Sequence, residues 1–439
     1  MKNLKTYINE NPYKNYIYSY PHKKAYREFK NEIDLKKLWK NRKTKDLTLY
    51  IHIPFCNSKC GYCNLFSTTA VNNEKIIRYV DKLIEEIKAI KEVLEIKEEA
   101  LFKAVIFGGG TPTILGVNLM EKLLKVLADE LSIDFKNIFF SIETSPKTMS
   151  REYMDLLKKY NINRISMGIQ SFNSCELKEI YRFEDMGSIE KSLDIIFNED
   201  IEIRNLDLIY GIPSQDIESW KDSLLKVISY KPEEIFIYPL YIREKTKLYN
   251  NYKRDFNKMM KMYDVGKELL IKNGYIQTSM RNFIREDMKN KLYPSYSCQE
   301  SEMIGIGCGA RSYISNVHYS RKYAVNQSNI DNIIEAYLKE ENFYFATYGY
   351  VLSEEEIKRK YILKSILKVS GLDINMYFER FGTYPIDDFK ELEELMDGGF
   401  LEAHNSILHP TDTGIKYSDA IGCLFISNEV NKKVNEFLE

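Results

Sequence analysis

The chain has 439 residues, of which 44% are hydrophobic and 29% charged, and its formal net charge is −1. These values exclude a disordered chain, and the near-zero charge gives the whole molecule no electrostatic reason to bind nucleic acid. No apolar run approaches the ~18 residues of a membrane helix, and the N-terminus lacks the apolar stretch of a signal peptide. We therefore expect a cytoplasmic protein that contacts neither nucleic acid nor membrane.

Residues 1–46 form a basic N-terminal arm. Residues 1–45 contain thirteen Lys or Arg and four Asp or Glu. A charge run of this kind is most often a solvated surface segment, and this is the preferred interpretation. The alternative is a basic lid over an anionic substrate.

Strand-like and helical runs alternate over residues 47–245. The expected strands cover residues 47–53, 103–107, 137–143, 164–169, 203–209 and 234–240. Apolar residues three and four positions apart predict helices over 75–98 and 117–131. Repeated β-then-α units imply parallel strands with right-handed crossovers. The predicted fold is α/β, a partial TIM-like (β/α)6 barrel, and a doubly wound open sheet is the alternative.

The pattern changes after residue 245. Residues 246–353 are interpreted as a barrel extension with a substrate-side segment, and they contain a predicted helix over 255–272 and a glycine-rich turn at 305–313. Residues 354–439 show helical runs and then a hairpin at 400–410, which suggests a winged-helix-like accessory domain. Residues 354–399 carry eleven acids against seven bases, which argues against DNA binding. A role in covering the substrate or binding a partner is preferred.

Three cysteines lie on one short loop after the first barrel strand. Cys56, Cys60 and Cys63 are spaced C-x3-C-x2-C. Soft thiolates suit iron, and three of them can hold three irons of a four-iron cluster, which leaves one iron open to a small ligand. A zinc site would need a fourth ligand, and His52 is the only nearby candidate. A disulfide framework requires a small, cysteine-dense secreted chain, whereas this chain has seven cysteines.

Five sequence blocks, in this order, resemble the radical S-adenosylmethionine (SAM) enzymes, and among them the HemN-like, or oxygen-independent coproporphyrinogen III oxidase-like, group that includes HemW. The blocks are Tyr50 before the loop and residues 108–113, 143–146, 164–172 and 207–213. The resemblance covers most of the chain. It implies a [4Fe-4S] cluster on the three cysteines, one or two molecules of SAM, and an electron donor such as flavodoxin or ferredoxin. The implied reaction is reductive cleavage of SAM to a 5′-deoxyadenosyl radical, which abstracts hydrogen from a small organic substrate.

The resemblance also implies a set of SAM-binding residues. They are Tyr50, Gly109, Gly110, Thr111, Glu143, Gln170, Arg182 and Asp207. The glycines would approach the SAM amino group, Glu143 would bind either that ammonium or the ribose, and Asp207 would hold ribose hydroxyls. Arg182, twelve residues after Gln170, would hold the SAM carboxylate, and its alternative is an exposed arginine at a helix end. Arg164 begins its strand and is interpreted as structural.

Three further residues are substrate-side candidates: Met280, Arg281 and Cys308. Arg281 could hold an anionic substrate, and Met280 belongs to the same segment. Cys308 could donate a hydrogen atom to a radical or contact a second ligand. A buried free cysteine is usually a small hydrophobe, and this alternative is slightly preferred.

The chain departs from the coproporphyrinogen dehydrogenases at one informative position. Those enzymes carry a further cysteine two residues after the third cluster cysteine, where this chain has Leu65. This departure argues against porphyrinogen decarboxylation as the native reaction. The open alternatives are a radical SAM reaction with a second SAM as methyl or methylene donor, a porphyrinogen oxidative decarboxylase, a HemW-like haem-binding or trafficking protein, and a non-catalytic iron–sulfur scaffold.

Overall fold

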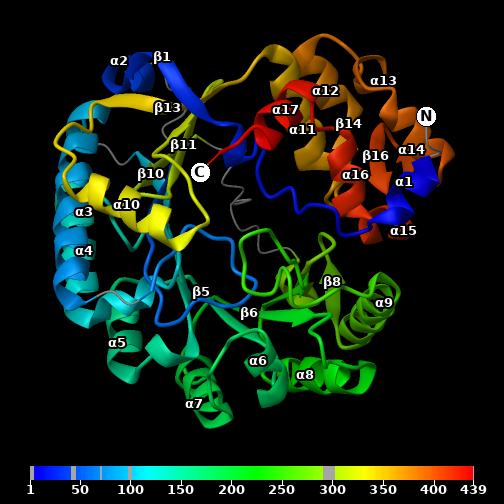
Figure 1. Cartoon of the computed structure of the whole chain (residues 1–439), viewed down its shortest axis with the longest axis horizontal. Helices are drawn as coiled ribbons and strands as arrows, with labels where there is room; N and C mark the ends of the chain where they lie inside the picture. The colour runs from blue at the N-terminus through cyan, green and yellow to red at the C-terminus, as the bar shows by residue number, and fades with distance from the viewer. Residues whose placement is uncertain (1–3, 41–45, 70–71, 97–100, 290–301, 439) are drawn as a thin grey trace.

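The barrel consists of six parallel strands inside a larger sheet. The computed structural model describes residues 4–40, 46–69, 72–96, 101–289 and 302–438 (Figure 1). The six parallel strands are β2 (Leu47–Ile53), β3 (Phe102–Gly109), β4 (Phe139–Thr144), β5 (Arg164–Gln170), β6 (Ile203–Tyr210) and β7 (Glu234–Pro239). Each pairs in parallel with the next, so the predicted partial barrel and its six strands are confirmed.

Further strands extend this sheet at both edges to thirteen, in the order β1-β13-β12-β11-β10-β2-β3-β4-β5-β6-β7-β9-β8. The added strands are β1 (Arg27–Asp34), β8 (Tyr275–Gln277), β9 (Asn282–Arg285), β10 (Met303–Ile306), β11 (Arg311–Ile314), β12 (Val317–Ser320) and β13 (Phe345–Val351). Of these, β10 runs parallel to β2, and so brings the glycine-rich turn that follows β10 beside the cysteine loop that follows β2.

Helices cover the outer face of the barrel (Figure 1). They are α3 (Asn73–Leu94), α4 (Gly116–Leu131), α5 (Arg151–Lys159), α6 (Ser174–Glu179), α7 (Met186–Phe197) and α8 (Ile217–Ser229), with α9 (Phe256–Lys272) and α10 (Gln327–Leu338) beside them. The helix predicted over 117–131 is confirmed. The one predicted over 75–98 begins earlier, at Asn73, because Asn72 caps its first turn. It also ends earlier, at Leu94, because Glu95 adopts a left-handed conformation that terminates the helix, and residues 97 and 98 lie outside the described residues.

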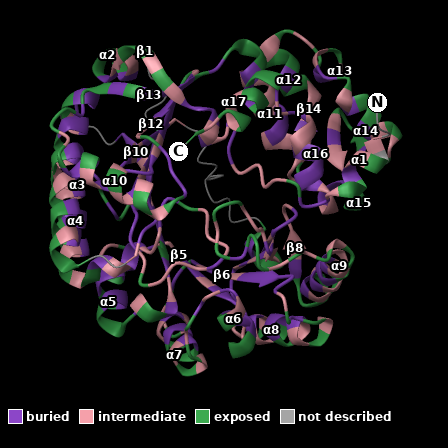
Figure 2. Ribbon diagram, in the orientation of Figure 1, coloured by how far each residue is buried: buried purple, intermediate pink, exposed green. Residues whose placement is uncertain are grey.

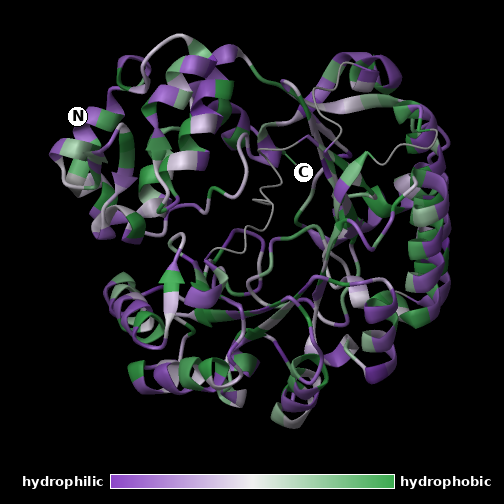
Figure 3. Cartoon of the chain, turned by 180° about the vertical axis from the view of Figure 1, so that it is seen from behind, coloured by the Kyte–Doolittle hydropathy of each residue, from purple (hydrophilic) through white to green (hydrophobic). Residues whose placement is uncertain are grey.

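The main hydrophobic core lies between the strands and these helices. In α3 the residues Ile76, Val80, Leu83, Ile87 and Ile90 are buried at three- and four-residue spacing. Buried residues concentrate in the strands and on the helix sides that face them, and the helices alternate between hydrophobic and hydrophilic stripes (Figures 2 and 3). Within the described ranges no helix is long and apolar enough to cross a membrane.

The C-terminal residues form a second hydrophobic core beside the barrel (Figure 1). Their elements are α11 (Glu354–Ile366), β14 (Leu372–Asp373), α12 (Ile374–Phe381), α13 (Pro385–Asp388), α14 (Glu391–Asp397), β15 (Leu401–His404), β16 (Ile407–Pro410), α15 (Asp412–Lys416), α16 (Ser418–Leu424) and α17 (Asn428–Asn435). The predicted hairpin is the antiparallel pair β15–β16, and β14 completes a three-stranded sheet.

The N-terminal arm is not a solvated surface segment, and that preferred interpretation is wrong. After α1 (Leu4–Glu10) the chain passes between the C-terminal unit and the barrel (Figure 1). Tyr13, Tyr20 and Tyr26 are buried there, and β1 then pairs with β13, before α2 (Leu35–Lys40). The composition of the arm is basic, but its tyrosines provide enough apolar surface to bury the segment.

Candidate functional site

Backbone hydrogen bonds hold the cysteine loop at the carboxyl end of β2, where chemistry in parallel barrels gathers. The N–H of Gly61 donates to the carbonyl of Ile180 (2.8 Å), and the N–H of Leu248 donates to the carbonyl of Gly61 (3.0 Å). The three thiols are half-buried. The loop is therefore fixed by segments that follow β5 and β7.

The donor set fits an iron–sulfur cluster better than a zinc ion. In the described ranges no three His, Cys, Asp or Glu side chains converge to hold a single metal ion. A cluster instead gives each thiolate its own iron, so thiols set apart on one loop suit it. His52 is not a fourth ligand, because its Nε2 contacts the carbonyl of Phe66 (2.8 Å) and its Nδ1 contacts the hydroxyl of Tyr50 (3.3 Å).

Glycines allow the turn after β3 to pack directly against the cysteine loop. A Cβ on Gly110 would lie 2.6 Å from the carbonyl oxygen of Phe55 and 2.8 Å from Sγ of Cys56. Gly109 adopts a φ of +120°, which favours glycine. The hydroxyl of Thr111 reaches Sγ of Cys56 at 3.7 Å. The segment predicted to approach SAM is thus in contact with a cluster cysteine.

Glu143, at the end of β4, faces the same turn. Its carboxylate accepts a hydrogen bond from the N–H of Gly109 (3.1 Å). The side chain is accessible but surrounded by the barrel, and this desolvation raises its pKa to about 7, an effect that the Gly109 hydrogen bond opposes. A cationic ligand in front of Glu143 would stabilise its charged form.

Asp207 lies on β6, which β5 separates from β4, and it has the polar partner that its sequence context required. Its carboxylate accepts a hydrogen bond from Asn205 (2.8 Å), which also donates to Ser166 (2.7 Å). Desolvation raises the pKa of Asp207 to about 6, while Asn205 and the charge of Arg164 oppose the shift. Arg164 pairs with Glu234 (2.9 Å) at the start of the strands, which agrees with its structural interpretation.

Gln170 and Arg182 meet at the end of β5. Gln170 has a φ of +72°, an uncommon conformation for a residue other than glycine. Arg182 is buried, so it is not an exposed arginine at a helix end. Its guanidinium donates to the carbonyl of Gly168 (2.9 Å) and to the carboxylate of Glu184 (3.2 Å). Desolvation opposes its charge, but neighbouring negative groups, among them the Glu184 carboxylate, outweigh this and raise the pKa of Arg182.

The structure therefore gathers the predicted SAM-binding residues around the cysteine loop, from the ends of β2 to β6. Sequence reasoning missed three of their partners: Ser166, Glu184 and Asn205. Asn205 lies two residues before Asp207 on the same face of β6, and this alternation is the signal that could have revealed it. Glu184 lies in a loop and follows no such pattern.

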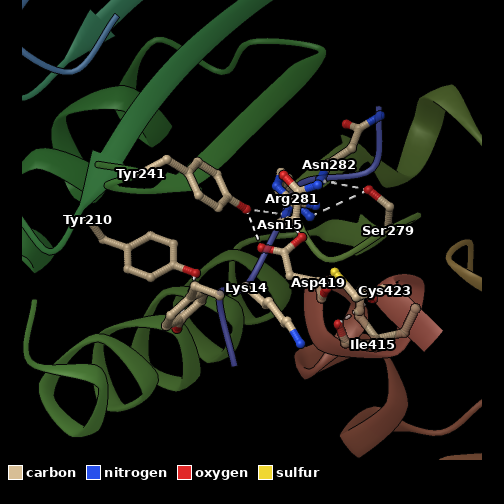
Figure 4. Close-up of polar contacts among 12 residues, drawn as sticks. Lys14, Asn15, Tyr210, Tyr241, Ser279, Arg281, Asn282, Ile415, Asp419 and Cys423 are labelled. Atoms are coloured by element: carbon tan, nitrogen blue, oxygen red, sulfur yellow. Dashed lines mark hydrogen bonds and ion pairs between the residues drawn. The ribbon is translucent and has the colours of Figure 1, made fainter. Parts of the chain in front are cut away.

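The three substrate-side candidates are all buried, and for Cys308 this agrees with the slightly preferred interpretation as a small hydrophobe. Cys308 is fully buried, and its thiol donates to the hydroxyl of Tyr79 on α3 (3.5 Å), so it faces the helix layer and not the barrel interior. Met280 is buried in the hydrophobic core. Arg281 is already ion-paired with Asp419 on α16 and hydrogen-bonded to Tyr241 (Figure 4). Arg281 thus makes a buried contact between the barrel and α16.

Comparison with known proteins agrees with this geometry. The model of the radical SAM superfamily matches residues 50–227. The heme chaperone HemW of Lactococcus lactis subsp. lactis is 27% identical over 394 residues, which cover 88% of this chain and 99% of that protein. The oxygen-independent coproporphyrinogen III oxidase of Escherichia coli K12 is 25% identical over 402 residues, which cover 84% of this chain and 83% of the enzyme.

A solved structure has the same fold. The solved structure of coproporphyrinogen III oxidase (HemN) from Escherichia coli, described as a radical SAM enzyme, superimposes with a TM-score of 0.79 and covers 93% of this chain and 96% of its own, at 22% identity. Residues 50–227 therefore match the radical SAM superfamily, and the chain over most of its length is similar to the HemN and HemW homologues.

Proposed function

We propose that this protein is a radical SAM enzyme that acts on a small organic substrate. The observation that carries the proposal is the charge arrangement beside the three-cysteine loop. Glu143 and Asp207 provide anionic acceptors, and Arg182 provides a guanidinium. SAM carries an ammonium group, ribose hydroxyls and a carboxylate, and these three groups match the acceptors and the guanidinium in kind.

The role of the protein residues is to bind and orient. When bound, the cluster and SAM would supply one-electron cleavage of a sulfur–carbon bond, giving methionine and a 5′-deoxyadenosyl radical that removes hydrogen from the substrate. Glu143 would accept from the ammonium, Asp207 from the ribose, and Arg182 would hold the carboxylate in a planar fork. The surrounding barrel would exclude water from the reacting groups.

An electron donor such as flavodoxin or ferredoxin would complete the system. Backbone hydrogen bonds join the cysteine loop to two segments that line a surface hollow of about 380 Å³. Tyr181, Phe183 and Leu248 contribute to this hollow, and Lys178 and Lys247 are exposed at it or next to it. Neither lysine forms an ion pair within the described part of the chain, so an acidic carrier would find complementary charge there.

A second candidate function is haem binding. It is favoured by the relatives named heme chaperone HemW, one of which matches 88% of this chain. Porphyrinogen decarboxylation, suggested by the oxygen-independent coproporphyrinogen III oxidases, is less favoured because Leu65 stands where those enzymes carry a further cysteine. Methyl transfer finds no support in the names of these relatives, and the proposal does not include it.

Anaerobic reconstitution with iron and sulfide tests the proposal. The protein should develop a four-iron chromophore and, with SAM and a strong reductant, release 5′-deoxyadenosine. Cys60→Ala should abolish the chromophore and the release of 5′-deoxyadenosine. Cys175→Ala, at an exposed position of α6, should retain both. A fully loaded protein that binds SAM without cleaving it, but shifts the absorbance of haem at stoichiometric ratio, would favour the haem-binding alternative.

A further inference from the structure

A buried lysine beside the cysteine loop lacks a carboxylate partner. Lys23, from the N-terminal arm, is 8% exposed. Its ammonium donates to the carbonyl of Gly309 (2.7 Å) and lies 5.1 Å from the centre of the Tyr323 ring. Among the described residues no Asp or Glu forms an ion pair with it. Burying an ammonium with only a carbonyl and an aromatic face is costly, and within the part of the chain that the structure describes only one of its three N–H donors has an acceptor.

A second cation lies close to Lys23. The guanidinium of Arg311 lies over the ring of Tyr18 (5.1 Å). The two tyrosine rings that these cations contact both pack against His22. The centre of the His22 ring lies 6.3 Å from that of Tyr18 and 6.3 Å from that of Tyr323. Burial, and after it the charge of Arg311, depress the pKa of Lys23, so the two positive charges repel each other.

This group of cations adjoins the candidate active site. The hydroxyl of Tyr323 donates to the carbonyl of Asn64 (3.1 Å), the residue after the third cluster cysteine. Gly309, the acceptor of the Lys23 ammonium, has a φ of +95° and packs so closely on His52 that a Cβ would lie 2.7 Å from its ring. The ammonium is therefore held by the turn between β10 and β11, next to the cysteine loop.

We propose that Lys23, with Arg311 beside it, forms an oxyanion-binding subsite that takes a carboxylate or phosphate group of the substrate. That this oxyanion belongs to the substrate rests on the proposed function, whereas the ability of Lys23 to bind an oxyanion is independent of it. An anion there would satisfy the two remaining donors of Lys23 and offset the repulsion from Arg311. Because Lys23 belongs to the N-terminal arm, the same anion would fasten the arm over the barrel, as the lid interpretation of the sequence expects.

Anion binding to the cluster-loaded full chain, without SAM or reductant, tests this subsite. Inorganic phosphate and succinate should each raise the melting temperature above that in chloride of equal ionic strength. Lys23→Gln should weaken both affinities about tenfold or more, which is the loss expected for a hydrogen bond to a charged group, and Lys23→Arg should retain them. The control is Lys322→Gln, because Lys322 is 66% exposed and already pairs with Glu28 (2.7 Å).

A measurement on the unmodified chain keeps the test independent of folding in the variants. Acylation of Lys23, read by mass spectrometry, should fall as phosphate or succinate is added, while acylation of Lys322 should not. Protection by phosphate alone or by succinate alone would support the subsite and identify the oxyanion that it takes. Equal labelling of Lys23 at all concentrations of both, or equal affinity in Lys23→Gln, would overturn it. Failure of SAM cleavage would not affect either readout.

Discussion

Arg281 and Asp419 form an ion pair that is buried between the barrel and the C-terminal unit. Their side chains are 7% and 2% exposed. Tyr241, just after β7, donates to the same carboxylate (Figure 4). The guanidinium also lies over the ring of Tyr16, 3.9 Å from its centre. Four segments far apart in the sequence thus meet at one charge pair, so this pair fastens the N-terminal arm and α16 to the barrel.

Removal of one partner should destabilise the protein strongly. In Asp419→Asn the guanidinium of Arg281 would remain charged and buried, and its Nε already has no hydrogen-bond partner. We expect the free energy of unfolding to fall by about 3–5 kcal/mol, measured by urea denaturation. The double variant Arg281→Met, Asp419→Leu should recover part of this loss, because neither buried charge then remains unpaired.

A surface pair provides the matched control for this prediction. Lys122 and Asp81 lie 2.7 Å apart, but each side chain is 50% exposed. Asp81→Asn should therefore cost less than about 1 kcal/mol. Equal losses in Asp81→Asn and Asp419→Asn would contradict the role assigned to the buried pair.

The stability of the SAM-free protein should depend on the protonation of Glu143. Its pKa rises from 4.5 to about 7 on folding, because desolvation by the surrounding barrel disfavours the charged carboxylate of this accessible side chain. The folded state therefore binds this proton more tightly, and the resulting stabilisation is complete below pH 4.5 and is lost as the pH rises to about 7. Glu143→Gln should abolish this loss, so the melting temperature of the variant relative to the unmodified protein should increase between pH 4.5 and 7.

Glu121 provides a control of opposite sign. It is a surface residue whose pKa is lowered by a hydrogen bond from Lys159. Its contribution to stability is present at neutral pH and is lost as the pH falls, so Glu121→Gln should lower the melting temperature slightly at pH 7 and leave it unchanged in acid. The same pH trend in Glu121→Gln and Glu143→Gln would contradict the desolvation argument for Glu143.

The barrel strands were predictable because parallel strands buried on both faces appear as apolar runs. The run at 47–53 becomes β2 with the same bounds, and the run at 203–209 becomes β6 (Ile203–Tyr210). The motif residues were predictable because they follow these strands. Their placement at one end of the barrel is a consequence of the parallel topology and needs no further sequence signal.

The contacts between distant segments were not predictable. Whether Arg281 faces a substrate or Asp419, 138 residues later, depends on tertiary packing that no local pattern encodes. Cys308 follows a glycine-rich strand end, and its orientation depends on the backbone of Gly307 and Gly309, both at positive φ. The charge of the N-terminal arm suggested solvent, yet the tertiary fold buries Lys23.

Glu184 should act as a positioning residue for Arg182. Arg182→Lys removes the planar fork and should raise the dissociation constant of SAM about tenfold or more, measured by equilibrium dialysis with the cluster-loaded protein. Glu184→Gln keeps the arginine but removes the carboxylate that orients it, so we expect a smaller increase. Arg151→Lys, at the exposed pair with Glu199, should bind SAM normally. Unchanged affinity in Glu184→Gln would show that Arg182 is oriented without it.

The close approach of Gly110 to the cysteine loop should be required for cluster assembly. In Gly110→Ala the new methyl group would overlap Sγ of Cys56 and the carbonyl oxygen of Phe55, so the loop would have to move. We expect iron and sulfide per chain to fall after anaerobic reconstitution, with far-ultraviolet circular dichroism unchanged. Gly187→Ala is the control, because its methyl group would meet only the carboxylate of Asp185 at 3.3 Å, near the start of α7. A full complement of iron in Gly110→Ala would mean that the loop can shift and still hold the cluster, and the packing of β3 against Cys56 would then be structural alone.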